Sequence, residues 1–168
     1  MMMRFIGALL LSGAAFLVGH FWIDSELSRQ SLYTGSTSFW AEFARLLSDT
    51  HASPEEIFRR LASFPRYQGL DFVSGAAGGL TPGKRFRDAY QEALEHSRVR
   101  TLDIAPLLEE AGQIPGAFSL EHQLERLEVL TRRMEEIARA RQEHIDASLR
   151  LWHSLSIFAA LFVFIFFI

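Results

Sequence analysis

The 168-residue sequence predicts an all-α protein: a membrane-anchored helical bundle with N- and C-terminal transmembrane helices. Apolar runs without charge lie near both ends, and between them apolar residues recur three and four positions apart, as on one face of a helix. We find no strand-like alternation of any length. We therefore expect a transmembrane helix over 1–23, a helical bundle domain over 24–149 and a transmembrane helix over 150–168, the last one continuous with a long helix of the domain.

Composition excludes several classes of protein. Hydrophobic residues make up 49% of the chain, which is enough to bury a core and argues against disorder. The absence of cysteine excludes disulfides, thiolate zinc sites and cysteine nucleophiles. A net charge of −3 gives no reason to expect nucleic acid as a partner.

The first apolar run, residues 5–23, has 19 residues without Asp, Glu, Lys or Arg. At about 1.5 Å per residue it spans roughly 28 Å, close to the hydrocarbon thickness of a bilayer. His20 and Trp22 lie near its inner end, where amphipathic rings favour the headgroup region. The alternative is a cleaved signal peptide, but large aromatic residues stand where a cleavage site needs small ones. We expect a retained anchor.

The second apolar run, residues 151–168, has 18 residues and is apolar on every helical face. Arg150 and Trp152 mark its start and are the predicted interface residues at this end. A buried C-terminal core helix is the alternative, but a helix that is apolar all round favours lipid as its surroundings.

Arginines near the inner ends of the two runs predict that the bundle is cytoplasmic. Only Arg4 lies outside the first run, whereas the inner ends are flanked by Arg29, Arg132, Arg133, Arg139, Arg141 and Arg150.

Turn and cap signals place the helices before residue 103. From Ser38 onward helical spacing prolongs the first helix, with a bend expected around Gly35. The capping box at 53–56, with proline at the first helical position, begins a helix that reaches about Ser63. Residues 66–80 stay ambiguous, and Thr81-Pro82 predicts another capped helix that reaches about Arg98.

A short helix over 103–111, ended by Gly112, and a turn at 114–116 precede the last helix. No glycine or proline follows Gly116, so we expect one continuous helix of about 49 residues, roughly 73 Å long. Its apolar stripe is Leu120, Leu124, Leu127, Leu130 or Thr131, Met134, Ala138, Ile145, Ser148 and Trp152, and only Arg141 interrupts it.

No catalytic residue, metal ligand or cofactor site is predicted. Residues 78–85 nearly match a phosphate-binding loop, but Arg85 replaces the hydroxyl that binds magnesium and Pro82 lacks an amide donor. No two of the six histidines are three or four residues apart. Arginines on the last helix alternate with glutamates, which favours a self-paired surface over a site for anionic lipid or an acidic partner. We expect a protein that is not an enzyme.

Several segments together resemble the stage III sporulation protein AB family of endospore-forming bacteria. They are FIGALL at 5–10, SPEEIFRRLA at 53–62, LLEEAGQIPG at 107–116, the Gln/Glu/Arg-rich helix from Leu120 and the ending LWHSLSIFAALFVFIFFI. The resemblance covers the whole chain.

This resemblance implies a fold similar to the cytoplasmic domain of type II secretion inner-membrane platform proteins. It implies a non-enzymatic subunit of a channel complex between mother cell and forespore, required for endospore formation and located in the mother-cell membrane that faces the forespore. The implied partners are a secretion-type ATPase (stage III sporulation protein AA), other stage III sporulation A membrane subunits and membrane lipid. Association with further copies of the chain stays open.

The membrane-distal turn is the expected contact for a partner, roughly 45 Å above the lipid if the last helix is straight. Ile114 and Phe118 are apolar residues of this turn, beside Glu109, Glu110 and Glu121. The alternative is that they are ordinary loop residues tucked into the bundle. For the whole chain, a helical signal-transducing sensor and a membrane hydrolase are the alternative functions.

Overall fold

The computed structural model describes the backbone of residues 2–50 and 52–167, and the side chains of 25–50, 52–151 and 154. Within these residues every regular element is a helix, as predicted. The elements are α1 (Met2–Thr50), α2 (Pro54–Ala62), η1 (Pro65–Tyr67), α3 (Asp71–Gly79), α4 (Phe86–Glu95), η2 (Arg98–Thr101), α5 (Ala105–Gln113) and α6 (Leu120–Phe167).

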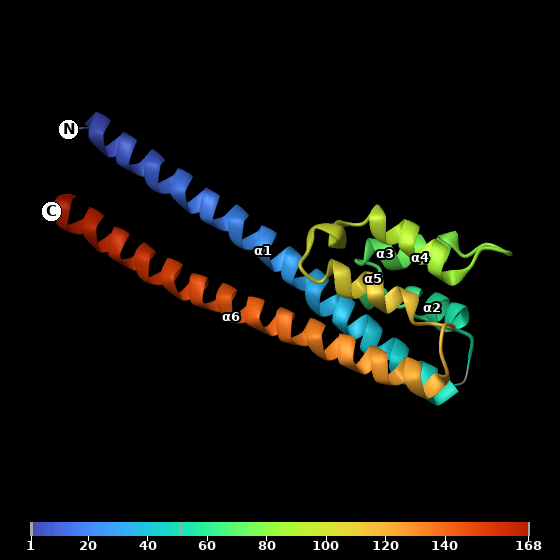
Figure 1. Ribbon diagram of the computed structural model, residues 1–168. Helices are drawn as coiled ribbons and strands as arrows, with labels where there is room; N and C mark the ends of the chain where they lie inside the picture. Colours follow the sequence, from blue (N-terminus) through green and yellow to red (C-terminus); the bar gives the residue numbers. More distant parts are fainter. Residues whose placement is uncertain (1, 51, 168) are drawn as a thin grey trace.

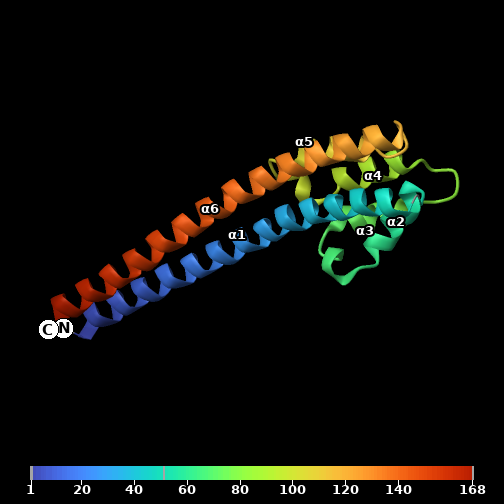
Figure 2. The same ribbon diagram turned by 90° about the horizontal axis from the view of Figure 1, so that it is seen from below.

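Two long helices form the frame of the molecule. α1 and α6 lie side by side in opposite directions, and the short helices α2–α5 pack on them near one end (Figure 1). Both chain termini lie at the other end, as the view from below also shows (Figure 2). We call the end that carries the 114–119 turn the distal end. The continuous last helix is confirmed, with 48 residues.

The membrane-crossing prediction falls largely on residues whose side chains the structure does not describe. His20, Trp22 and Trp152 lie outside the described side chains, and Arg150 is exposed. Among the described residues, no helix carries an apolar stretch of the length that crossing a membrane requires.

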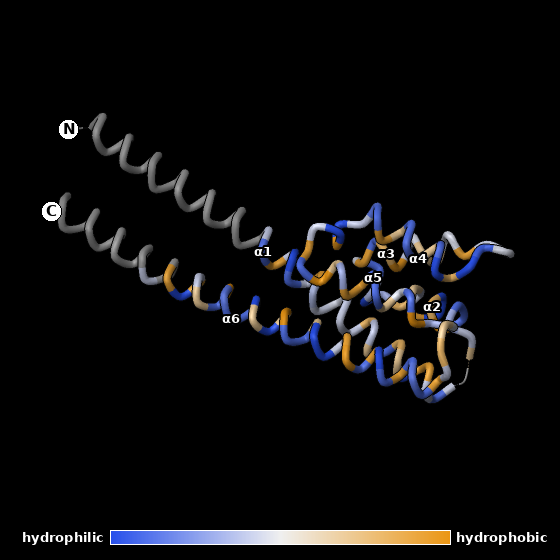
Figure 3. Tube along the Cα trace, viewed as in Figure 1, coloured by the Kyte–Doolittle hydropathy of each residue, from blue (hydrophilic) through white to orange (hydrophobic). Residues whose placement is uncertain are grey.

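The core lies between α1 and the short helices, and aromatic rings fill it. Phe39 makes edge-on contacts with Phe58 and Tyr67, at centroid distances of 5.0 and 5.2 Å. Trp40 meets Tyr90 in the same way at 5.6 Å. Edge-on contacts are a favoured geometry for buried rings, because a positive ring edge meets a negative face. Along α6 apolar residues recur at helical spacing (Figure 3), and Met134 lies fully buried in the core.

The cap signals predicted one helix start and misplaced another. The Ser53 hydroxyl accepts a hydrogen bond from the Glu56 backbone N–H, so α2 begins as the capping box indicates. The start predicted at Thr81-Pro82 is wrong. Gly83 has a φ of +89°, which a right-handed helix cannot contain, and the Lys84 N–H donates to the Thr81 carbonyl across a turn. α4 therefore begins at Phe86.

Gly112 lies inside α5 and does not end it, which corrects the prediction. A Cβ atom at this position would lie 2.1 Å from Cδ1 of Tyr90, so only glycine lets α5 approach that ring. The Tyr90 hydroxyl donates to the Leu108 carbonyl at 3.0 Å. Burial raises the pKa of Tyr90, so the hydroxyl keeps its proton and the hydrogen bond persists.

Arg141 interrupts the apolar stripe of α6 because it pairs across the seam with α1. Its guanidinium lies 3.0 Å from the Glu26 carboxylate, 3.9 Å from that of Asp103 and 5.1 Å from the ring centroid of Tyr33. The sequence predicts that Arg141 pairs with glutamates of its own helix, but the acidic partners of its guanidinium are Glu26 and Asp103. Glu26 and Asp103 also tie α6 to both α1 and the segment that leads into α5.

We predict that Gly112→Ala destabilises the protein by about 1–3 kcal/mol, because the added methyl overpacks the contact with Tyr90. Chemical denaturation of the full chain in detergent, followed by circular dichroism, measures the change. Gly78→Ala on α3 is the matched control. A methyl group there would have nothing within 4 Å, so the change is expected to be neutral or stabilising by up to about 1 kcal/mol. Equal effects of the two substitutions would contradict the packing described here.

Candidate partner-binding surfaces

The distal turn between α5 and α6 is held in one conformation by Gln123. The side-chain oxygen of Gln123 accepts from the Gly116 N–H at 3.2 Å, and its amide nitrogen donates to the Phe118 carbonyl. Gly116 has a φ of +77°, which favours glycine and closes the turn. Gln123 is a buried residue in the first turn of α6. Its two hydrogen bonds therefore tie the distal turn to that helix.

The structure divides the five predicted contact residues of this turn into two groups. Three of them are exposed, namely Phe118, Glu109 and Glu121, and Glu110 is half-buried. Ile114 is 1% exposed, so it supports the turn from within the core and presents no surface to a partner. Its backbone stays helical at the end of α5, which directs the side chain inward.

Phe118 is the centre of a polar cluster that sequence reasoning missed. The ring is 42% exposed; the guanidinium of Arg126 lies 5.0 Å from its centroid, and the ring of His122 lies 5.2 Å away. Arg126 also pairs with Glu110 at 3.6 Å. His122 and Arg126 lie four residues apart on one side of the first turns of α6, whereas Phe118 precedes that helix, so its contacts with them depend on how the turn meets α6. We call Glu109, Glu110, Phe118, Glu121, His122, Glu125 and Arg126 the distal surface.

The distal surface is shallow and carries more acidic than basic groups. Phe118, Glu121 and Glu125 line an open depression of about 380 Å³. Glu125 lies 3.4 Å from the His122 ring nitrogen, whereas Glu121 has no ion pair among the described side chains. An exposed aromatic ring with acidic neighbours suits an apolar contact with a partner that brings basic residues around it.

The segment that resembles a phosphate-binding loop does not form a cradle. Lys84 forms an ion pair with Glu92, and this hydrogen bond lowers the pKa of the Glu92 carboxyl. The side chain of Arg59 donates to the Leu80 carbonyl, so the start of the loop is tied to α2. Among the described residues no group of three His, Asp or Glu side chains is placed to hold a metal ion.

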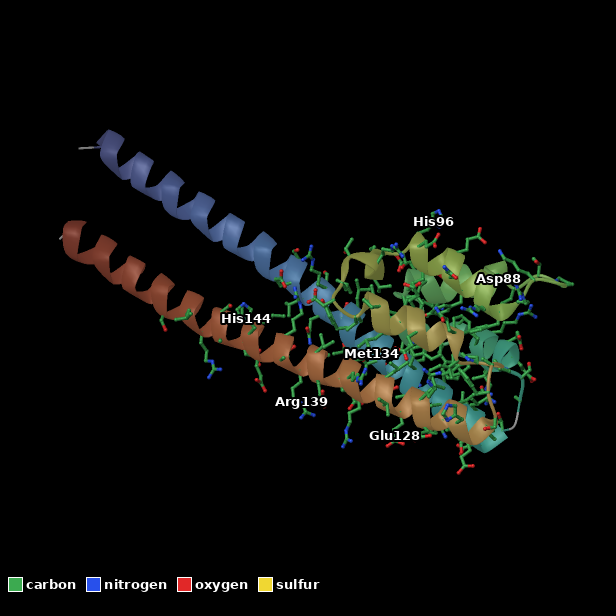
Figure 4. The ribbon with its side chains drawn as sticks, viewed as in Figure 1. Asp88, His96, Glu128, Met134, Arg139 and His144 are labelled. Atoms are coloured by element: carbon green, nitrogen blue, oxygen red, sulfur yellow. The ribbon has the colours of Figure 1, made fainter. Side chains whose placement is uncertain are left out.

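A second surface runs between the two long helices. Thr34, Ser38 and Ala41 of α1 line an open groove of about 670 Å³. Its lining also includes Glu135 and Arg139 of α6 and, from α1 and η1, Glu42, Arg45 and Arg66. Arg139 points away from the short helices (Figure 4). We call this the helix-pair groove.

Glu42, which lines the helix-pair groove, joins α1 to η1. Its carboxylate lies 2.7 Å from the guanidinium of Arg45 and 3.6 Å from that of Arg66. The hydrogen bond from Arg45 holds the pKa of the Glu42 carboxyl below its ordinary value of 4.5. Arg66 in turn lies over the ring of Tyr67, 4.6 Å from its centroid.

We predict a pH-dependent difference in stability between the protein and its Glu42→Gln variant. The pKa is lower in the folded state, so the ionised carboxylate stabilises the fold above about pH 4.5 and this contribution is lost as the pH falls through the folded pKa. The melting temperature of the variant is expected to be lower at pH 7, by an amount equivalent to under about 1 kcal/mol because the group is near the surface. The difference should vanish in acid.

Thermal unfolding at a series of pH values measures this difference. Glu143→Gln, an exposed position on α6, is the matched control and should show no such trend. A difference in melting temperature between the protein and Glu42→Gln that stays constant down to pH 3 would contradict the lowered pKa of the Glu42 carboxyl.

Comparison with known families supplies one match. A family model described as stage III sporulation protein AB matches residues 4–168. Neither a curated protein nor a solved structure matches the chain.

Proposed function

Because the chain belongs to the stage III sporulation protein AB family, and so has a role in sporulation, we propose that it is a membrane-anchored platform subunit. In this proposal the two long helices hold the bundle at the membrane that faces the forespore. The distal surface binds a secretion-type ATPase, stage III sporulation protein AA, and the chain itself carries out no chemistry. Other stage III sporulation A subunits share the same membrane.

The observation that carries the proposal is the direction of the two long helices. α1 and α6 both continue past the bundle to the same end of the molecule, where the charge-free runs of the sequence lie (Figure 1). A helix pair with apolar runs at one end and a folded domain at the other suits attachment to a bilayer by that end. The distal surface then faces away from the membrane, toward soluble partners.

The distal surface supports a partner-binding role through its shape and its rigidity. Phe118 is a large apolar side chain left exposed on a turn that Gln123 fixes. An aromatic residue on a preorganised turn is a favourable anchor, because little side-chain or loop entropy remains to be lost on binding. The surrounding carboxylates favour a partner with a basic face and speed its approach.

We predict that the double reversal Glu109→Lys/Glu110→Lys weakens ATPase binding at least about tenfold, and that Phe118→Ala does so as well. The reversal changes the sign of the surface and also removes the partner of Arg126, whereas Phe118→Ala removes the apolar anchor. Pull-down of the detergent-solubilised full chain with the cognate ATPase, over a range of salt concentrations, measures the change.

The matched control is the double reversal Glu136→Lys/Glu143→Lys, two exposed positions on α6 outside the distal surface. It should leave ATPase retention unchanged. If Glu109→Lys/Glu110→Lys and Phe118→Ala both retain the ATPase as the parent and the control do, the distal surface is not the contact. If the parent itself fails to bind the ATPase at low and moderate salt, the platform proposal is wrong.

We predict that the chain behaves as an integral membrane protein whose bundle faces the cytoplasm. It should stay in the membrane pellet through high salt and alkaline carbonate, and leave it only with detergent, because apolar helices in lipid are not released by breaking ionic contacts. A protease site inserted after Gly83, in an exposed turn, should be cut in inverted vesicles and protected in intact protoplasts. Release of the full chain by carbonate would contradict the anchoring.

A further inference from the structure

Arg126 contacts the two groups of the distal surface that a basic partner would use. Its guanidinium lies 5.0 Å from the ring centroid of Phe118 and 3.6 Å from the Glu110 carboxylate. An aromatic face and a carboxylate both attract a cation placed between them. The chain therefore holds a guanidinium of its own at the place where the proposed function expects one from the partner.

The same arrangement of arginine, aromatic ring and glutamate occurs twice more in the chain, in the interior of the fold. The two sets are Arg66 with Tyr67 and Glu42, and Arg141 with Tyr33 and Glu26. In both sets the tyrosine ring is 1% exposed, so the arginine covers a ring that no partner can reach. The ring of Phe118 is instead 42% exposed, so Arg126 covers part of a ring that is open to a partner.

The contacts that hold Arg126 over Phe118 are weak. The side chains of Arg126 and Glu110 are 41% and 45% exposed, and water competes for both members of such an ion pair. The backbone beside the ring is held separately, because Gln123 donates to the Phe118 carbonyl. The guanidinium can therefore move away while the turn that carries the ring keeps its conformation.

Arg126 lowers the affinity of the distal surface for a basic partner in two ways. It covers part of the apolar anchor, so the partner must displace it to reach the whole ring. It also neutralises Glu110 and brings a positive charge close to a partner of the same sign, which is unfavourable. The remaining glutamates of the surface attract such a partner, whereas Arg126 opposes it.

We propose that Arg126 is an autoinhibitory group of the distal surface. In the free chain it occupies the face of Phe118 and the carboxylate of Glu110, and an arginine of the partner takes its place on binding. The inference rests on the proposed function, because it requires a partner with a basic face. Arginine fits better than lysine, since a planar guanidinium can stack on a ring and pair with a carboxylate at the same time.

The direct test is the affinity of the Arg126→Gln variant for the cognate ATPase, measured by titration of the detergent-solubilised full chain. We expect binding about three- to tenfold tighter than that of the parent, because the ring and Glu110 are released. The matched control is Arg132→Gln, which removes one exposed arginine of the same helix outside the distal surface and should change the affinity by less than about twofold. The circular dichroism spectra of both variants should match that of the parent.

Hydroxyl-radical footprinting of the full chain measures the cover over Phe118 without any partner. Oxidation of Phe118 should rise in Arg126→Gln and in Glu110→Gln, by up to about twofold because the ring is already 42% exposed, and should stay unchanged in Arg132→Gln.

Unchanged oxidation of Phe118 in Arg126→Gln and Glu110→Gln, or equal or weaker ATPase binding by Arg126→Gln, would overturn the inference. The proposed function would stand in that case, because the parent still binds the ATPase. Failure of the parent and Arg126→Gln alike to bind the ATPase would instead defeat the proposed function, and the autoinhibitory role with it.

Discussion

The antiparallel contact between α1 and α6 is the interaction on which the rest of the structure depends. The short helices α2–α5 all lie between these two elements in the chain and pack on them near one end. Leu127, Met134 and Ala138 bury the apolar side of α6 against the bundle. Two polar contacts fix the register: Gln30 donates to the Ala138 carbonyl, and Arg141 pairs with Glu26. Apolar stripes alone allow a pair of long helices to slide by a turn, whereas a partly buried polar contact selects one register.

This register connects the two ends of the molecule. Arg141 contacts Asp103 just before α5 begins, and α5 then leads to the turn that presents Phe118. The same α6 supplies Gln123, which fixes the turn, and Arg126, which covers the exposed ring. A partner bound at the distal surface therefore rests on the helix that continues toward the proposed membrane anchor. A rigid connection of this kind suits a platform, which must hold a partner in place without catalysing a reaction of its own.

Sequence patterns predict the structure correctly where interactions between neighbouring residues determine it. The capping box at Ser53, the turn at Gly116 and the unbroken last helix all depend on neighbours along the chain, and each is as predicted. The predictions are wrong mainly where contacts between residues far apart in the sequence determine the structure. Gly112 is glycine because Tyr90 of α4 occupies the space that a side chain would need, not because a helix ends there. Ile114 is buried because α5 keeps its helical direction to the end. Thr81-Pro82 has the composition of a helix start, but Gly83 turns the chain first.

For the candidate site, the exposed glutamates and Phe118 could be identified from position alone, whereas the Arg126 and His122 contacts required the register of α6 against the turn.

Native-state hydrogen exchange of the intact chain tests the central role of the α1–α6 pair most directly. If the pair supports the rest of the fold, the amides of 30–47 in α1 and 123–145 in α6 open together, with the highest free energy of opening in the chain, while α2–α5 open at equal or lower cost. Exchange of the α6 segment on its own, with α1 and the short helices still protected, would show that the bundle stands without the pair and would contradict the account.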